Sequence, residues 1–161
     1  MKRALLLVLF ACCISSLATA QAQPQPPQAV APATQAKAEA EAERAALSAE
    51  AEKGDAVAQY RLGMMYYVGN VIPQDYEEAA RWLRLSAEQG NPEAMFRFGC
   101  LLYYGRGVER DYVQAHMWFN LAAATEIKAA DEYREMVAEK MTAKEITEAQ
   151  KLARNWKPKG K

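Results

Sequence analysis

Two consecutive stretches of the chain decide its fold: DAVAQYRLGMMYYVGNVIPQDYEEAARWLRLSAEQG at residues 55–90 and NPEAMFRFGCLLYYGRGVERDYVQAHMWFNLAAATE at residues 91–126. Aligned without a gap at an offset of 36, they place the same residue types at the same positions. The pairs that we take as structural residues of the repeat are Gly63 with Gly99, Gly69 with Gly105, Asp75 with Asp111, Ala79 with Ala115 and Trp82 with Trp118. A period in the thirties with helical patterning indicates a solenoid of stacked helix pairs.

Each repeat is predicted to contain two helices, A and B. Helix A begins after Asp55 or Asn91, because a short polar side chain can accept a free backbone N–H at a helix start. It ends at Gly69 or Gly105, since glycine readily adopts the left-handed conformation found there. Helix B begins at a predicted capping box, in which Glu or Gln reaches back to the N-cap three residues earlier. The two boxes are Asp75 to Glu78 and Asp111 to Gln114.

Three features predict how helices A and B pack. Gly63 and Gly99 interrupt helix A, where glycine costs about 1 kcal/mol relative to alanine. A close approach of the neighbouring helix, possible only without a Cβ, would compensate for that cost. The apolar stripe of helix B carries Ala79 and Trp82 in the first repeat, and Ala115 and Trp118 in the second. We expect each tryptophan to be buried against its own helix A.

The pattern of the repeat resembles the Sel-one-like repeat, a relative of the tetratricopeptide repeat. The residues that carry the resemblance are Leu62-Gly63-x-x-Tyr66-x-x-Gly69, Asp75-Tyr76-x-x-Ala79-x-x-Trp82 and Gly105-Arg106-Gly107-Val108-x-x-Asp111-Tyr112-x-x-Ala115-x-x-Trp118. Departures from the family pattern occur at Val71, Ser86, Leu102 and Glu126. The resemblance implies an all-α, right-handed α/α solenoid of antiparallel helix pairs that works as a protein–protein interaction or scaffold module.

The repeats are flanked by further predicted helices. Residues 37–54 form an N-terminal helix that looks like the second half of a degenerate repeat. Residues 127–157 form a pair of capping helices, since a solenoid must cover its last open face. The second capping helix begins with a capping box from Thr142 to Glu145, and residues 158–161 form a basic tail.

The N-terminal residues 1–20 have the layout of a signal peptide. A basic start is followed by a short apolar run, and Ala18-Thr19-Ala20 offers the small-x-small pattern of a cleavage site. We expect cleavage after Ala20, a disordered Gln/Pro/Ala linker over residues 21–36, and a periplasmic or secreted protein with no membrane span left after cleavage. A retained anchor and a lipoprotein cut before Cys12 are the alternatives.

Neither the composition nor the motifs of the sequence indicate an enzyme. Twenty basic and twenty acidic residues give no net charge, which argues against a nucleic-acid partner. Cys100 is alone once the signal is removed, and His116, the single histidine, is expected to point outward. No zinc ligand set or phosphate-binding glycine loop is present, so we predict no cofactor. Relatives with disulfide pairs in each repeat have been linked to β-lactam hydrolysis, which leaves an exported hydrolase acting on β-lactams or cell-wall material as the alternative.

The best candidate site is a surface on helix A that binds a protein or peptide partner. A second apolar stripe on each helix A carries aromatic residues with arginines beside them, and such residues are common anchors for partners. The candidate residues are Gln59, Tyr60, Arg61, Tyr67, Phe96, Arg97 and Tyr103. They line the concave side of the solenoid, or the aromatic members fill the space between repeats; the sequence leaves both possibilities open.

Overall fold

The computed structural model describes residues 32–70, 72–125 and 127–160. The expected signal peptide (1–20) and most of the expected linker (21–36) lie outside these residues. The described residues form seven helices: α1 (Pro32–Glu52), α2 (Ala56–Val68), α3 (Tyr76–Glu88), α4 (Pro92–Tyr104), α5 (Tyr112–Ala123), α6 (Lys128–Ala138) and α7 (Ala143–Asn155). Helix α1 starts five residues earlier than predicted, inside the segment that we expected to be linker.

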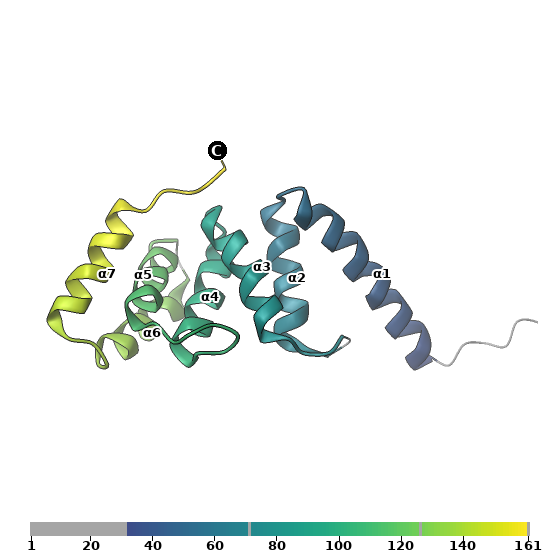
Figure 1. Cartoon of the computed structure of the whole chain (residues 1–161), viewed down its shortest axis with the longest axis horizontal. Helices are drawn as coiled ribbons and strands as arrows, with labels where there is room; N and C mark the ends of the chain where they lie inside the picture. The colour runs from purple at the N-terminus through teal and green to yellow at the C-terminus, as the bar shows by residue number, and fades with distance from the viewer. Residues whose placement is uncertain (1–31, 71, 126, 161) are drawn as a thin grey trace, which may run out of the picture.

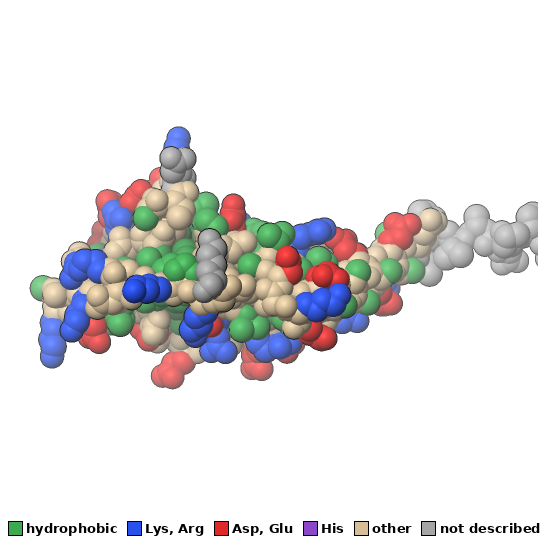
Figure 2. Space-filling view, turned by 90° about the horizontal axis from the view of Figure 1, so that it is seen from above, with side chains coloured by type: hydrophobic (Ala, Val, Ile, Leu, Met, Phe, Trp, Pro, Cys, Tyr) green, Lys and Arg blue, Asp and Glu red, His purple; other side chains and the backbone are tan. Residues whose placement is uncertain are grey.

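The helices stack in chain order along one axis (Figure 1). Helices α2 and α3 form the first pair, α4 and α5 the second, and α6 and α7 both pack against α5. Helix α1 packs against α2 at the opposite end. The fold class expected from the repeat, an all-α solenoid of helix pairs, is confirmed. Acidic, basic and hydrophobic side chains are interspersed along the elongated surface seen in Figure 2.

The predicted ends of the first helices are confirmed. The Asp55 carboxylate accepts the backbone N–H of Ala58 at 2.6 Å, and Asn91 caps α4 in the same way. Gly69 and Gly105 end α2 and α4 with φ values of 70° and 67°, in the left-handed region that favours glycine. Sequence-coded caps therefore fix where both helices begin and end.

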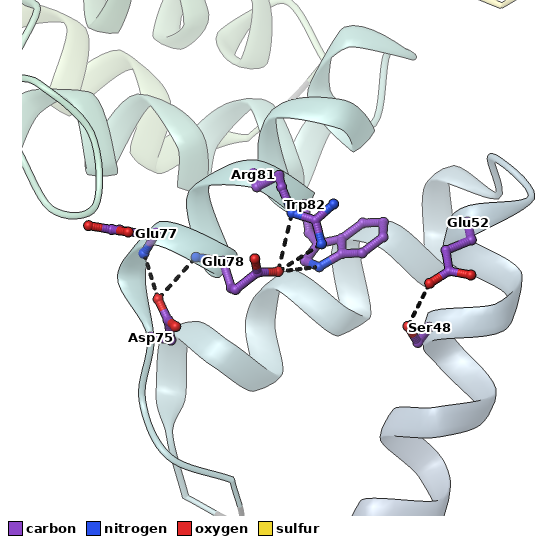
Figure 3. Close-up of polar contacts among 7 residues, drawn as sticks. All are labelled: Ser48, Glu52, Asp75, Glu77, Glu78, Arg81 and Trp82. Carbon is purple, nitrogen blue, oxygen red and sulfur yellow. Dashed lines mark hydrogen bonds and ion pairs between the residues drawn. The ribbon is translucent and has the colours of Figure 1, made fainter.

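The capping boxes predicted for α3 and α5 differ from the structure. Asp75 accepts the N–H groups of Glu77 and Glu78, but the Glu78 side chain does not reach back (Figure 3). It accepts instead from Trp82 Nε1 at 3.1 Å and from Arg81 at 2.8 Å. At α5 the structure likewise shows only the Asp111 half of the box. The reciprocal pair forms at the start of α7.

Close packing within each pair explains the helical glycines. A Cβ on Gly63 would lie 2.8 Å from Leu83 Cγ on α3. One on Gly99 would lie 2.9 Å from Phe119 Cε1 on α5. Leu83 and Phe119 occupy the same place in the two repeats, so both pairs use the same contact. The close approach inferred from the sequence is confirmed.

The repeat alanines of the second helices, Ala79 and Ala115, are completely buried, each 0% exposed. Both belong to the main hydrophobic core. Each lies in the first turn of its helix and donates its backbone N–H to the carbonyl of the capping aspartate, Ala79 to Asp75 at 3.0 Å and Ala115 to Asp111 at 2.9 Å. Ala79 and Ala115 therefore serve the structure of the repeat, as predicted, and present no surface to a partner.

Both repeat tryptophans are buried, each 4% exposed. Trp82 packs in a cluster with Leu47 of α1 and Leu62 of α2. Trp118 meets the Phe98 ring of α4 at 5.8 Å between ring centres. Each tryptophan therefore contacts its own helix A, as predicted, and also lies against a segment outside its own helix pair: α1 for Trp82 and the C-terminal tail for Trp118.

The outward orientation predicted for His116 is wrong. Its side chain is 3% exposed, and its counterpart Ala80 in the first repeat is 2% exposed. Helix α5 packs against α4, α6 and α7, so more than one side of it is covered. Both Ala115 and its neighbour His116 are buried for this reason. Burial in a stacked array therefore extends to positions that a single amphipathic stripe would place in solvent.

The C-terminal tail is part of the packed structure. After α7 the chain turns back, and Trp156 packs against Trp118 with 6.0 Å between ring centres. Farther along, the Lys159 N–H donates to the Glu88 carbonyl at 2.7 Å, and its ammonium pairs with the Glu88 carboxylate at 3.0 Å. Figure 1 shows this segment crossing back from α7 toward the middle of the molecule. The tail thus ties the end of the chain to the end of α3.

Candidate functional site

The first helices of the pairs, α2, α4 and α6, present side chains to one surface, here called the A face. Positions three or four residues apart on each helix lie on the same side. The large, partly or fully exposed members of the A face are Tyr60, Arg61, Met64, Tyr67, Val68, Phe96, Arg97, Tyr103, Tyr104, Tyr133 and Met136. All but one of the candidates predicted from the sequence lie on it.

Gln59 is the exception, because its amide group is occupied inside the fold. Its side chain is 4% exposed. Its Nε2 donates to the Ala51 carbonyl at 3.0 Å, and its Oε1 accepts from Gln89 Nε2 at 2.8 Å. Gln59 therefore joins α2 to the ends of α1 and α3. This prediction is corrected: Gln59 is a structural residue and is not available to a partner.

Tyr60 and Arg61 lie at the N-terminal end of the A face. With Leu47 of α1 and Met64 of α2 they line an open, largely apolar hollow of about 380 Å³. The Arg61 guanidinium pairs with Glu43 of α1 at 2.6 Å, so its charge is already balanced. This end of the A face offers apolar surface without a free charge.

Tyr67 and Tyr103 are half-buried and pack inside their own repeats. The Tyr67 ring lies edge-on to Tyr76 with 5.7 Å between centres, and Tyr103 lies 5.7 Å from Tyr112. The two contacts are equivalent in the two repeats and join the end of helix A to the start of helix B. Both tyrosines thus combine a packing role with a partly exposed edge.

Phe96 and Arg97 lie in the middle of the A face. The Phe96 ring is 5.7 Å from Phe119 and 5.3 Å from Tyr133, so it joins α4 to α5 and α6. The Arg97 guanidinium lies 5.7 Å from the centre of the Phe96 ring. Arg97 is therefore partly exposed and lies beside an aromatic ring.

The structure adds three residues that the sequence argument missed: Tyr104, Arg106 and Tyr133. Tyr104 is 48% exposed, and the Arg106 guanidinium lies 5.2 Å from its ring. The pKa of Tyr133 is raised, first by a hydrogen bond with the Tyr104 hydroxyl and then by burial, with smaller effects from Cys100 and Tyr67. The Tyr133 ring itself packs against Phe96 of α4 and Phe119 of α5. Tyr104 lies seven residues after Arg97, a helical spacing that could have revealed it.

The arrangement offers no activated nucleophile at Cys100. Burial raises the pKa of the Cys100 thiol to about 12, although the nearby Arg97 charge opposes this shift. A thiol with so high a pKa stays protonated at neutral pH and is a poor nucleophile. Burial, and after it the Arg134 charge, lowers the pKa of His116. Its Nδ1 has no hydrogen-bond partner in the described structure.

Other kinds of site can be checked over the described ranges. In them, no group of three or more His, Cys, Asp or Glu side chains is placed to hold a metal ion. None of the seven helices combines the length and apolar character that a membrane crossing requires. A larger hollow of about 750 Å³ is lined by residues of α3, α4, α5 and α7 and of the loop before α5. Its charged lining residues are Arg84, Arg110, Glu88, Glu109, Asp111 and Glu145, so acidic groups outnumber basic ones there.

Comparison with known proteins agrees with this geometry. The family model described as Sel1 repeat matches residues 56–91 and 92–124. The chain contains two Sel1 repeats. They coincide with the pairs α2–α3 and α4–α5, and Sel1 repeats generally act as protein–protein interaction modules. No curated protein matches the chain.

Two solved structures share the Sel1-repeat architecture. A protective antigen of uropathogenic Escherichia coli with an SLR fold is 38% identical, with a TM-score of 0.64 over 68% of this chain and 24% of its own. A Sel1 repeat protein from Oxalobacter formigenes is 35% identical, with a TM-score of 0.55 over 56% of this chain and 26% of its own. The chain therefore spans about a quarter of the length of these relatives.

Proposed function

We propose that this Sel1-repeat chain is a non-enzymatic scaffold or adaptor that binds a protein or peptide partner on its A face. The observation that carries the proposal is the group of aromatic contacts on the A face: Phe96 of α4 meets Tyr133 of α6 at 5.3 Å, and Tyr103 meets the exposed Tyr104 at 4.8 Å. Aromatic side chains give a large contact area with little loss of conformational entropy, and tyrosine adds a hydroxyl for hydrogen bonding.

The patch formed by Tyr67, Phe96, Tyr103, Tyr104 and Tyr133, here called the aromatic patch, has the organisation of a binding surface. Tyr67 and Tyr103 are held by contacts within their own repeats, so the surface is formed before a partner arrives. Pre-organised groups lose less entropy on binding. Tyr104 is the most exposed member and would be its central contact.

Replacement of Tyr104 with serine tests the proposal. The matched control is Leu152→Ser on α7, which removes a large side chain of similar exposure, 39%, away from the A face. Crosslinking pull-downs from an envelope fraction would be run with both variants and the original protein, alongside thermal melts by circular dichroism. We expect Tyr104→Ser to lose partner capture while melting close to the original protein.

Two results would contradict the proposal. One is capture by Tyr104→Ser at the level of the original protein. The other is equal loss with Leu152→Ser, which would mean that any surface change disrupts binding. A tyrosine that anchors a partner usually costs more than 1 kcal/mol of binding energy when truncated, so the expected loss is measurable.

The proposed place of action is the periplasm or the cell exterior. Its support is the signal-like layout of residues 1–20 and the small-x-small pattern at Ala18-Thr19-Ala20. N-terminal sequencing of the exported protein should show that it begins at Gln21. A start at Met1, or at Cys12 with attached lipid, would show that the proposed cleavage is wrong.

A further inference from the structure

Two arginines lie at the edges of the aromatic patch without balancing carboxylates. Arg97 and Arg106 make no ion pair with any carboxylate in the described ranges. Arg61, on the same face, pairs with Glu43 at 2.6 Å. The positive charge at the patch is therefore available to a ligand, whereas the charge at the N-terminal end of the A face is not.

Both arginines lie against aromatic rings of the patch. Arg97 lies against Phe96, and Phe96 meets Tyr133 edge-on at 5.3 Å. Arg106 lies against Tyr104 and against Tyr76 of α3, to whose hydroxyl it donates a hydrogen bond at 3.4 Å. An aromatic surface holds a guanidinium in place by cation–π attraction, and the N–H groups that make no other bond can bind an anion.

Acidic groups beside the patch belong mainly to α6. Arg61 is the only charged residue of α2, and the only charged residues of α4 are Glu93 and Arg97. Helix α6, which supplies Tyr133, carries Asp131, Glu132 and Glu135, and Asp131 is paired with Arg134 at 2.8 Å. A partner would therefore meet complementary charge where it places carboxylates over Arg97 and Arg106, on the α4 side of the patch.

We propose that the aromatic patch binds an extended acidic peptide segment whose carboxylates pair with Arg97 and Arg106. Its backbone and apolar side chains lie over Tyr104 and Tyr133. Arginine suits this role because its planar group can hold a carboxylate with two parallel hydrogen bonds. This inference rests on the proposed function, since it names the chemistry of the partner at the same face.

The spacing of the arginines defines the peptide further. Arg97 lies on α4, which ends seven positions later at Tyr104, and at about 1.5 Å per residue these positions are about 10 Å apart along the helix axis. Arg106 follows two residues later and lies against the Tyr104 ring. An extended peptide advances about 3.3 Å per residue. Two acidic residues about three to four positions apart would therefore reach both arginines.

A displayed library of random peptides, each about twelve residues long and able to reach about 40 Å when extended, provides the test. The library would be selected on the original protein and on the double variant Arg97→Gln/Arg106→Gln, which keeps side-chain size and polarity. The matched control is Arg84→Gln/Arg154→Gln, which removes the same charge from exposed positions on α3 and α7. We expect enriched Asp and Glu pairs at this spacing with the original protein and the control, and not with the double variant.

Measured affinities make the result quantitative. The most enriched peptide should bind the double variant at least about tenfold more weakly. Its affinity for the original protein should fall between about 0.05 M and about 0.3 M sodium chloride, because salt screens exposed charges. A version with Asn and Gln in place of its acidic residues should lose binding. Equal binding of that neutral version, or of a single-stranded oligothymidylate of similar length, would overturn the inference.

The inference and the proposed function can fail separately. If Tyr104→Ser abolishes partner capture while Arg97→Gln/Arg106→Gln captures normally, the A face binds a partner that is not acidic, and the inference is wrong. If neither variant changes capture, the proposed function is wrong as well. Circular dichroism melts of the double variant would show that a loss of binding is not a loss of folding.

Discussion

The tryptophans of the two repeats have the same burial but different hydrogen bonding. Trp82 Nε1 donates to Glu78 at 3.1 Å, whereas Trp118 Nε1 is buried with no partner among the described residues. Gln114 stands where the first repeat has Glu78. A buried donor without a partner costs about 1–3 kcal/mol of stability. The second repeat therefore contains a buried N–H donor without an acceptor, and the first repeat does not.

Gln114→Glu should stabilise the protein, because it offers Trp118 the acceptor that Trp82 already has. We expect a gain of about 1 kcal/mol in the free energy of unfolding at neutral pH. Urea denaturation at neutral and at acidic pH would measure it. The gain should disappear at a pH where the new carboxyl group is protonated. A gain that is independent of pH, or no gain, would show that the bond does not form.

Trp82→Ala and Trp118→Ala should each lower the free energy of unfolding by about 3–5 kcal/mol, the usual range for a large buried aromatic residue. In a small domain a loss of this size can approach the total free energy of unfolding. Thermal melts of both variants beside Leu152→Ala, a change at a more exposed position, would provide the measurement. Small shifts for both tryptophan variants would contradict the two-helix packing.

His116 should make stability depend on pH. Burial lowers its pKa below the ordinary value of 6.5, with a further contribution from Arg134, so the unfolded chain binds the proton more readily. The contribution of neutral His116 is therefore present above about pH 6.5 and is lost as the pH falls toward the lower pKa of the folded state. Urea denaturation between about pH 7.5 and about pH 5 should show decreasing stability.

His116→Ala is the matched control, because alanine occupies the equivalent position 80 in the first repeat. We expect this variant to lose most of the pH dependence in that range. An unchanged slope would assign the effect to other groups.

At the scale of the elements, the close contact at Gly63 and Gly99 sets the spacing within each helix pair. Gly63→Ala would gain about 1 kcal/mol in helix propensity but would force its Cβ against Leu83. Overpacking of this kind costs about 1–3 kcal/mol, so we expect a net loss of stability. Gly99→Ala should also lower the stability, because its Cβ would lie against Phe119.

A double-mutant cycle tests the cause of that loss. In the background of Leu83→Ala the clash partner is gone, and Gly63→Ala should become neutral or stabilising. Chemical denaturation of the four proteins measures the coupling. A loss of the same size in both backgrounds would show that the contact with Leu83 is not responsible.

At the scale of the whole molecule, the tail after α7 connects the second repeat to the end of the first. Trp156 covers Trp118, and Lys159 bonds to Glu88 at the end of α3. A variant that ends at Asn155 loses these contacts. We expect it to be less stable by about 2 kcal/mol, most of which comes from the exposed apolar surface.

Lys159→Ala separates the two contributions of the tail. It removes an exposed ion pair, worth about 0–1 kcal/mol, but keeps the backbone hydrogen bond and Trp156. Its thermal midpoint should stay close to that of the original protein. A midpoint as low as that of the truncated chain would assign the tail's effect to the lysine charge.

The helix pairs, their phase and most of their ends can be read from the amino-acid sequence alone. Asp55, Asn91, Gly69 and Gly105 act through backbone groups within a few residues, so their effect can be read locally. The glycines at 63 and 99 could be explained because the repeat supplies two copies of the same contact. Both the fold class and the second apolar stripe on helix A follow from such local periodicity.

Which side of each helix is covered depends on how the helices pack together. His116 and Gln59 are polar, yet neighbouring helices bury both, and Gln59 satisfies its amide with groups from α1 and from the end of α3. The Glu78 side chain bonds to Trp82 instead of its own N-cap. The contact of Phe96 with Tyr133 joins residues from separate helices whose relative placement depends on packing. Periodicity along one helix fixes its faces, but the partner of each face is set by the stacking of the whole array.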